Sequence, residues 1–130
     1  MLALMRCLSA NGKHVDWRLE FAARAEADFE LIFDHLFESY RNFGEPFEQA
    51  FEHARIRVLQ VRRDTERILI APDRGQRRDD LLEGCRNLAI DRASYWFIAD
   101  QDEKLITVLA VFFGGQHEQQ RMMTRLLGGQ

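Results

Sequence analysis

Cysteine, proline and long apolar runs are scarce in this sequence. The 130 residues include only 2 Cys and 2 Pro. Cys7 and Cys85 have no histidines at metal-ligand spacing, so we expect free thiols and neither a disulfide framework nor a zinc site. No apolar run approaches the roughly 20 residues that a membrane span needs, and the opening MLALMRCLSA lacks the long apolar segment of a secretion signal. We therefore expect a cytoplasmic protein without a membrane partner, a metal ion or a cofactor.

The composition is that of one soluble globular domain. Hydrophobic residues make up 46% of the chain and charged residues 30%, a balance that speaks against intrinsic disorder. The length suffices for a single hydrophobic core. We expect one domain over residues 15–130, preceded by an extension over residues 1–14 that lacks periodicity. Because Met5 offers a second start, this extension is either disordered or not translated.

A basic stretch lies within an acidic protein. The formal net charge is −3, yet residues 55–78 hold eight arginines against three acids. Such a patch suits nucleic acid or an acidic protein, and it is equally compatible with a face that meets only solvent.

The first half of the chain reads as a strand followed by two helices. Residues 14–21 alternate apolar and polar, as in a half-buried strand, with Val15, Trp17, Leu19 and Phe21 on one face. From Ala22 the apolar spacing becomes helical, and the acids, Asp28 among them, are expected largely on the other side of this helix. Gly44 is placed to end the helix, and Pro46 suits the first turn of the next one. The short connection predicts an antiparallel helical hairpin.

The aromatic content of the hairpin exceeds what mutual packing of two helices requires. We expect some of these phenylalanines to cover the sheet and some to be left for a partner, while a place in the core remains open for each. The residues are Phe29, Phe33, Phe37, Phe47 and Phe51.

The second half reads as a link and a sheet. Residues 62–80 form the link, with a turn at Pro72 and Gly75. Strands follow at Leu88 to Ile90, at Ala93 to Phe97 and at 105–113, the last two joined by a turn at 100–103. Ile106, Val108, Ala110 and Phe112 are expected on one face of the last strand. Its intervening residues are also apolar, which predicts a central strand that is covered on both sides.

Two arginines enter this apolar region. Because arginine is rarely buried without a partner, Arg86 and Arg92 each face water, meet a carboxylate or await an anionic partner. After the break at 114–115 we expect a C-terminal helix from Gln116 to Leu127, in which Met122 and Met123 are core filler rather than a binding surface.

The order and spacing of these elements resemble those of RelE/ParE toxins of bacterial type II toxin-antitoxin systems, and of the ParE branch in particular. The resemblance is carried by WRLEFAARAEADFELIFDHL, by the turn from Pro72 to Gly75, by the strand from Gly84 to Leu88 and by the Arg92-x-x-Tyr95 pattern. It implies an α+β fold with an N-terminal strand, an antiparallel helical hairpin, a curled antiparallel sheet of three further strands and a short C-terminal helix.

The resemblance also implies a partner. A ParD-like antitoxin would lay an amphipathic helix and an extended tail along apolar grooves of the toxin. The antitoxin-contact candidates are Phe29, Phe33, Phe37, Phe47, Phe51, Arg74, Arg77 and Arg78.

The branch decides the activity that is implied. RelE-like members cleave mRNA on the ribosome, with basic residues stabilising phosphate charge. Arg86 and Arg92 lie at or near two such basic positions, but Gln116 and Met122 stand where a basic residue and a tyrosine are needed, and no lysine precedes Lys104 in the strands. His117 is a candidate acid or base, or a surface residue. ParE-like members poison DNA gyrase by binding, which needs no catalytic group.

We therefore expect a gyrase poison rather than an enzyme. The alternatives are a RelE-type mRNA endonuclease that uses Arg86, Arg92 and His117, and a decayed toxin domain that acts only as a binding module. The target-binding candidates are Arg86, Arg92, Tyr95, Gln116 and His117.

Overall fold

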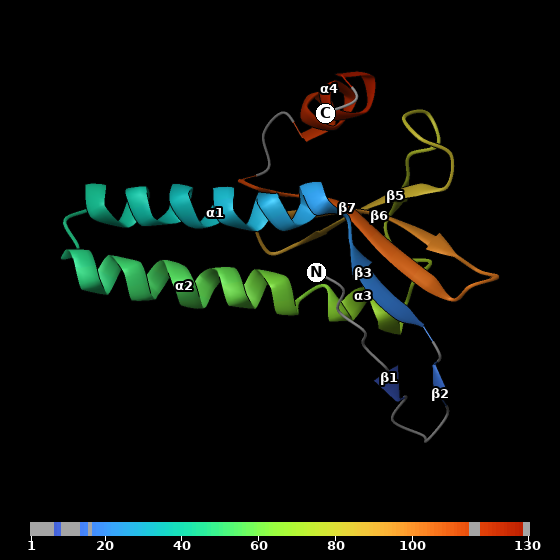
Figure 1. Cartoon of the computed structure of the whole chain (residues 1–130), viewed down its shortest axis with the longest axis horizontal. Helices are drawn as coiled ribbons and strands as arrows, with labels where there is room; N and C mark the ends of the chain where they lie inside the picture. Colours follow the sequence, from blue (N-terminus) through green and yellow to red (C-terminus); the bar gives the residue numbers. More distant parts are fainter. Residues whose placement is uncertain (1–6, 9–13, 16, 115–117, 129–130) are drawn as a thin grey trace.

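Figure 1 shows the computed structural model, which describes all residues except 1–6, 9–13, 16, 115–117 and 129–130. In the described part of the chain, the elements in order are β1 (Cys7–Leu8), β2 (His14–Val15), β3 (Arg18–Phe21), α1 (Ala23–Asn42), α2 (Phe47–Arg63), α3 (Glu66–Ile70), β4 (Gln76–Arg77), β5 (Cys85–Ile90), β6 (Ala93–Asp100), β7 (Leu105–Phe113) and α4 (Glu118–Gly128).

The strand expected at residues 14–21 is divided in two. β2 ends at Val15 and pairs antiparallel with β1, and β3 begins only at Arg18. β1 and the first residue of β2 lie within the residues expected to form the extension. From Trp17 onward the predicted alternation holds: Trp17, Leu19 and Phe21 are buried, while the residues between them are half-buried.

The helical hairpin is confirmed. α1 and α2 lie side by side and antiparallel, joined by a short turn (Figure 1). Gly44 in this turn has φ of 99°, a left-handed conformation that glycine adopts without strain, and its N–H donates to the carbonyl of Arg41 at the helix end.

The main sheet has the strand order β3-β7-β6-β5-β4. The predicted antiparallel pairing of β5 with β6 and of β6 with β7 is confirmed, and β7 is central as predicted. β3 pairs parallel with β7, from Arg18 opposite Leu105 to Phe21 opposite Val108, so the sheet is mixed. A parallel pair needs a long crossover connection, and the helices and strands between β3 and β7 supply it.

The prediction that Ile106, Val108, Ala110 and Phe112 share one face is wrong. Trp96 pairs with Ala110 and Phe97 with Val108, so Leu109 is an extra residue in β7. A bulge of one residue reverses the faces of the residues that follow it. Ile106 and Val108 therefore face the core under the hairpin, whereas Ala110 and Phe112 face a second core.

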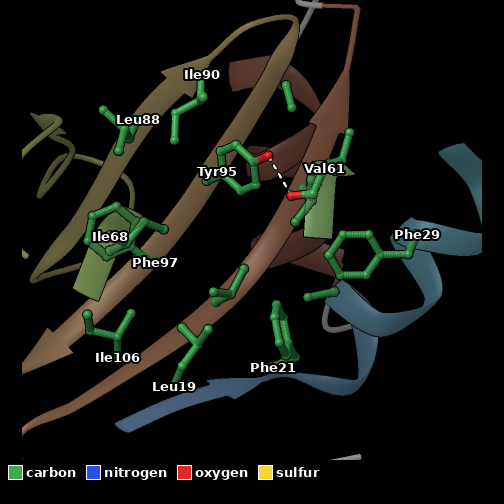
Figure 2. Close-up of a cluster of buried hydrophobic side chains, with 14 of the residues drawn as sticks. Leu19, Phe21, Phe29, Val61, Ile68, Leu88, Ile90, Tyr95, Phe97 and Ile106 are labelled. Atoms are coloured by element: carbon green, nitrogen blue, oxygen red, sulfur yellow. Dashed lines mark hydrogen bonds between the residues drawn. The ribbon is translucent and has the colours of Figure 1, made fainter. Parts of the chain in front are cut away.

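The two cores lie on opposite faces of the sheet. The larger lies between the sheet and the hairpin and contains Leu19, Phe29, Tyr95 and Phe97 among others (Figure 2). The smaller contains Cys85, Trp96, Ala110, Phe112 and Met122, the last of which is supplied by α4. Met122 is fully buried, as expected of core filler, whereas Met123 is 42% exposed.

The link at residues 62–80 is more ordered than expected. It contains α3 and β4, which pairs with β5 at the edge of the sheet. Gly75 has φ of 93°, and a Cβ at this position would lie 2.7 Å from the carbonyl oxygen of Asn87. The predicted turn thus needs a glycine both for its conformation and for its contact with β5.

One hydroxyl fastens the sheet to the hairpin. Tyr95 is fully buried, and its hydroxyl donates to the carbonyl oxygen of Val61 at 2.7 Å (Figure 2). This carbonyl lies in the last turn of α2, where the N–H of Thr65 turns instead to Arg62. Tyr95 therefore satisfies a helix-end acceptor that is buried away from water. Burial raises the pKa of the phenol well above its usual value.

We expect the substitution Tyr95→Phe to lower the free energy of unfolding by about 1–2 kcal/mol, because it leaves this buried carbonyl without a donor. Chemical denaturation measures the change. Tyr40→Phe is the matched control, since the Tyr40 hydroxyl makes no hydrogen bond among the described residues and its ring stacks on His53. Equal effects of the two substitutions would contradict the role given to Tyr95.

Candidate functional site

Arg86 is engaged within the fold. It is half-buried on β5, and its Nη1 donates to the carbonyl oxygen of Asp73 at 2.8 Å and of Gly75 at 3.4 Å. The hydrogen-bond partner of its guanidinium is thus the main chain of the turn, and not a carboxylate. Arg86 holds the predicted turn against β5.

Arg92 is exposed at the turn between β5 and β6. Its carbonyl accepts the N–H of Gly114 at 2.9 Å, which joins this turn to the end of β7. Within the described residues its guanidinium makes no hydrogen bond or ion pair. Arg86 and Arg92 lie at opposite ends of β5, so the structure does not bring the two together. Gln116 and His117 lie outside the described residues.

The remaining target-binding candidate, Tyr95, lies in the core under the hairpin. It is 0% exposed and bonded to α2, so its side chain presents no surface to a partner. The structure gives it a place in packing instead.

Half of the eight arginines in the basic stretch at 55–78 form ion pairs within the protein itself. Arg77 pairs with Asp79 at 2.9 Å and Arg78 pairs with Asp80 at 2.8 Å. These arginines lower the pKa of the two carboxyls, although for Asp79 the hydrogen bond from the N–H of Gly84 is the larger cause. Arg78 is also mostly covered, because it lies over the ring of Trp96.

Three further arginines of the stretch lie on the hairpin and have partners within the fold. Arg62 forms a bidentate ion pair with Glu26, and its guanidinium lies over the rings of Phe21 and Phe29. Arg55 pairs with Glu52, and Arg57 lies over Phe113. Arg63, Arg67 and Arg74 are exposed, and their side chains make no hydrogen bond or ion pair in the described part of the chain. The eight arginines therefore do not form one open cationic surface.

The phenylalanines of the hairpin divide as expected between core and surface. Phe29 is buried and meets Phe21 edge to face at 5.6 Å between ring centroids. The others form what we call the hairpin aromatic face, in which the rings contact one another across the two helices: Phe33, Phe37, Phe47 and Phe51. Phe47 is 58% exposed and Phe51 is 44% exposed, so this cluster is incompletely covered. These exposed rings are therefore a candidate interaction surface.

A second surface feature lies between α1, the end of β7 and α4. We call it the α1–α4 groove; it has a volume of about 620 Å³. α4 lies on the side of α1 that is opposite to α2 (Figure 1). The groove is lined by Arg24, Asp28, Leu31, Ile32, His35, Val111, Phe112, Phe113, Gln120, Arg121, Thr124 and Arg125.

A buried ion pair forms the base of this groove. Asp28 is 3% exposed and accepts hydrogen bonds from the guanidinium of Arg125 at 2.8 and 3.0 Å. The same carboxylate accepts the N–H of Val111 at 2.9 Å, and Arg125 also donates to the carbonyl of Leu109 at 3.2 Å. One carboxylate thereby joins α1, β7 and α4.

The need for this pair follows from the length of β3. Pairing between β3 and β7 ends at Val108, so beyond that residue the edge of β7 has no neighbouring strand. Buried backbone N–H and C=O groups need partners, and Asp28 and Arg125 supply one acceptor and one donor.

Sequence reasoning missed this pair, because Asp28 was grouped with the acids on the solvent side of the helix. A signal was present: Asp28 follows Ala25 by three residues and precedes Ile32 by four, so it falls on the buried stripe. An acid on a buried stripe indicates a buried donor.

The described residues hold no metal-ligand cluster and no membrane-spanning helix, and their buried cysteine is unreactive. Cys85 is free and buried, and burial raises its pKa to about 11, so it is not a reactive thiol. No three His, Cys, Asp or Glu side chains in the described ranges are grouped to hold a metal ion. No described helix is long and apolar enough to cross a membrane.

Comparison with known proteins identifies the fold. No protein-family model and no curated protein matches the chain. Among solved structures, it is similar to a chain of the structure described as the chromosomal ParDE TA system from P. aeruginosa, with a TM-score of 0.50 and 22% identity over 75% of this chain and 95% of that chain. The expected RelE/ParE-like architecture is therefore confirmed as a fold.

We expect Arg125→Met to lower the free energy of unfolding by about 3 kcal/mol, because it leaves the Asp28 carboxylate buried without a cation. Adding Asp28→Asn to this variant should recover at least about 1 kcal/mol, since an amide oxygen still accepts the Val111 N–H without a buried charge. Denaturant titration of the single and double variants measures both values.

Arg63→Met is the matched control for that pair of variants. Arg63 is exposed and unpaired among the described residues, so its loss should change stability by less than about 0.5 kcal/mol. A double variant no more stable than Arg125→Met would show that the charge on Asp28 is not desolvated.

Proposed function

We propose that this protein is the toxin of a type II toxin-antitoxin pair, that it arrests growth by poisoning DNA gyrase, and that a ParD-like antitoxin neutralises it. The single observation that carries the proposal is the likeness of its fold to a chain of a ParDE system. The resemblance of sequence segments spread from Trp17 to Tyr95 supports the same family.

The hairpin aromatic face supports an antitoxin as partner. Phe47 and Phe51 are exposed although they belong to a continuous cluster of rings, and an apolar surface formed by two helices suits the apolar face of an amphipathic partner helix. Aromatic side chains that are half-covered in the free protein are the residue type that dominates binding energy once a partner desolvates them.

The placement of the arginines favours a poison over a nuclease. RNA cleavage requires charged groups that converge on one phosphate. Arg86 and Arg92 lie at opposite ends of β5, and Arg86 is bonded to the main chain of the turn. Among the candidates that the structure describes, Arg92 is the one whose side chain is exposed and unpaired, and we assign it the contact with the target.

Expression of the full chain in a bacterium tests the activity. We expect growth arrest with gyrase-dependent DNA breaks, and we expect Arg92→Ala to weaken the arrest while leaving the stability of the protein unchanged. Arg67→Ala removes an equally exposed and unpaired arginine from α3 and should have no effect.

Other outcomes of the expression experiment identify the alternatives. Arrest with intact DNA and shortened transcripts would establish an mRNA endonuclease, and His117 would be the first residue to change. Unchanged growth would mean that the domain acts only as a binding module.

The proposed antitoxin surface is tested by measuring the affinity of an antitoxin that is encoded by a neighbouring gene. We expect Phe47→Ser combined with Phe51→Ser to weaken antitoxin binding at least about 100-fold, because two aromatic anchors are lost, while the variant still arrests growth. Isothermal titration measures the affinity. Ile70→Ser is the control, since Ile70 is 70% exposed on α3, away from the hairpin aromatic face. An unchanged affinity of the double variant would exclude this face as the antitoxin site.

A further inference from the structure

One side of α2 faces water although it carries two large aliphatic residues. Ile56 is 53% exposed and Leu59 is 45% exposed. Each lies two residues from a buried residue of the same helix, Ala54 and Val61 respectively, and two residues correspond to about 200° around an α-helix. Both side chains therefore project from the side of α2 that lies nearly opposite to the core.

This side of α2 is separate from the hairpin aromatic face. Phe51 precedes Ile56 by five residues, which places the two side chains about 140° apart around the helix. Phe47 and Phe51 contact Phe37 of α1, so they lie on the side of α2 that is turned toward α1. A partner on the hairpin aromatic face therefore does not account for the exposure of Ile56 and Leu59.

Charged residues of opposite sign flank the two aliphatic residues. Glu52 precedes Ile56 by four residues, and Arg63 follows Leu59 by four, so the four residues form one stripe along the helix, which we call the α2 outer stripe. The side chain of Arg63 has no ion pair among the described residues. Glu52 is paired with Arg55, but a carboxylate can accept hydrogen bonds from a second guanidinium.

The α2 outer stripe is complementary to itself when it is reversed. It reads acid, aliphatic, aliphatic, base, with the same spacing at both ends. A second copy laid antiparallel would place Ile56 opposite the partner's Leu59 and Glu52 opposite the partner's Arg63, and two-fold symmetry repeats both contacts. Exposed aliphatic residues that occur singly need no partner. The reversed order of charges around this pair is what indicates a second copy of the same helix.

We propose that the α2 outer stripe is the contact surface for a second copy of this chain, in a two-fold dimer with antiparallel α2 helices. Ile56 packs against the partner's Leu59, and an ion pair between Glu52 and the partner's Arg63 closes each end. The contact spans about three helical turns and is smaller than a standard interface, so we expect a dimer that dissociates at about 100 µM. The inference rests on these residues alone and not on the proposed function.

Sedimentation equilibrium of the full chain from about 10 µM to about 1 mM measures the association. We expect the mass to rise from that of a monomer toward that of a dimer. Glu52→Arg and Arg63→Glu should each weaken the association at least about tenfold, because each variant alone places like charges opposite one another at both ends. An equal mixture of the two variants should associate as tightly as the unchanged chain, because both ion pairs are restored between unlike copies.

Further variants separate the apolar contact from general effects of substitution. Ile56→Ser should weaken the association at least about tenfold, since it removes two packing contacts by symmetry. Leu127→Ser is the matched control: Leu127 is 83% exposed on α4, and its loss should change the association less than about twofold. Glu38→Arg, at an exposed position of α1, is the control for charge reversal and should also change it less than about twofold. Circular dichroism verifies that each variant is folded.

Three results would overturn the inference. A chain that stays monomeric at about 1 mM would exclude a dimer of useful affinity. A dimer that tolerates Ile56→Ser and both charge reversals would have its contact elsewhere. A mixture of the two charge-reversed variants that stays monomeric would exclude the antiparallel arrangement. Because none of these measurements uses growth arrest or an antitoxin, failure here and failure of the proposed function are told apart.

Discussion

The structure depends on how the backbone N–H and C=O groups of β7 find hydrogen-bond partners beyond the point where β3 ends. Asp28 from α1 and Arg125 from α4 bond to the backbone of β7 and to each other, so one buried pair fixes the positions of two helices on the central strand. A buried ion pair adds little net stability. It constrains the geometry strongly, because any arrangement that separates the two charges leaves each of them buried without a partner. It holds α4 over the smaller core, where Met122 completes the packing against Trp96 and Phe112.

α1 contributes to two surfaces of different chemistry, one on the side toward α2 and one on the side toward α4. Toward α2 it presents Phe33 and Phe37, which contact the exposed rings of Phe47 and Phe51. Toward α4 it presents Leu31 and His35 beside arginines and the end of β7. A partner that engages both surfaces binds the second one as an intramolecular step, so each contact raises the effective concentration of the other. The rigidity that the Asp28 pair gives to α1 keeps the two surfaces at a fixed separation.

The elements that the sequence predicts well are those with local patterns. The hairpin follows from helical spacing and from Gly44, and the antiparallel β5 to β7 sheet follows from alternation and short turns. The bulge at Leu109 was not predictable, because both faces of β7 are apolar and a shift of one residue leaves the pattern unchanged. The partners Asp28 and Arg125 are 97 residues apart, so only the place of Asp28 on a buried stripe hinted at them. The sequence leaves the role of the basic stretch open, because counting charges does not show that Asp79 and Asp80 pair with Arg77 and Arg78.

The end of β7 lies beside Arg92, which is exposed and unpaired among the described residues, unlike Arg86. Gly114 follows Phe113 directly, and its N–H bonds to the carbonyl of Arg92 at 2.9 Å. Arg92 therefore lies at the same end of the sheet as Phe113, whereas Arg86 lies at the other end of β5.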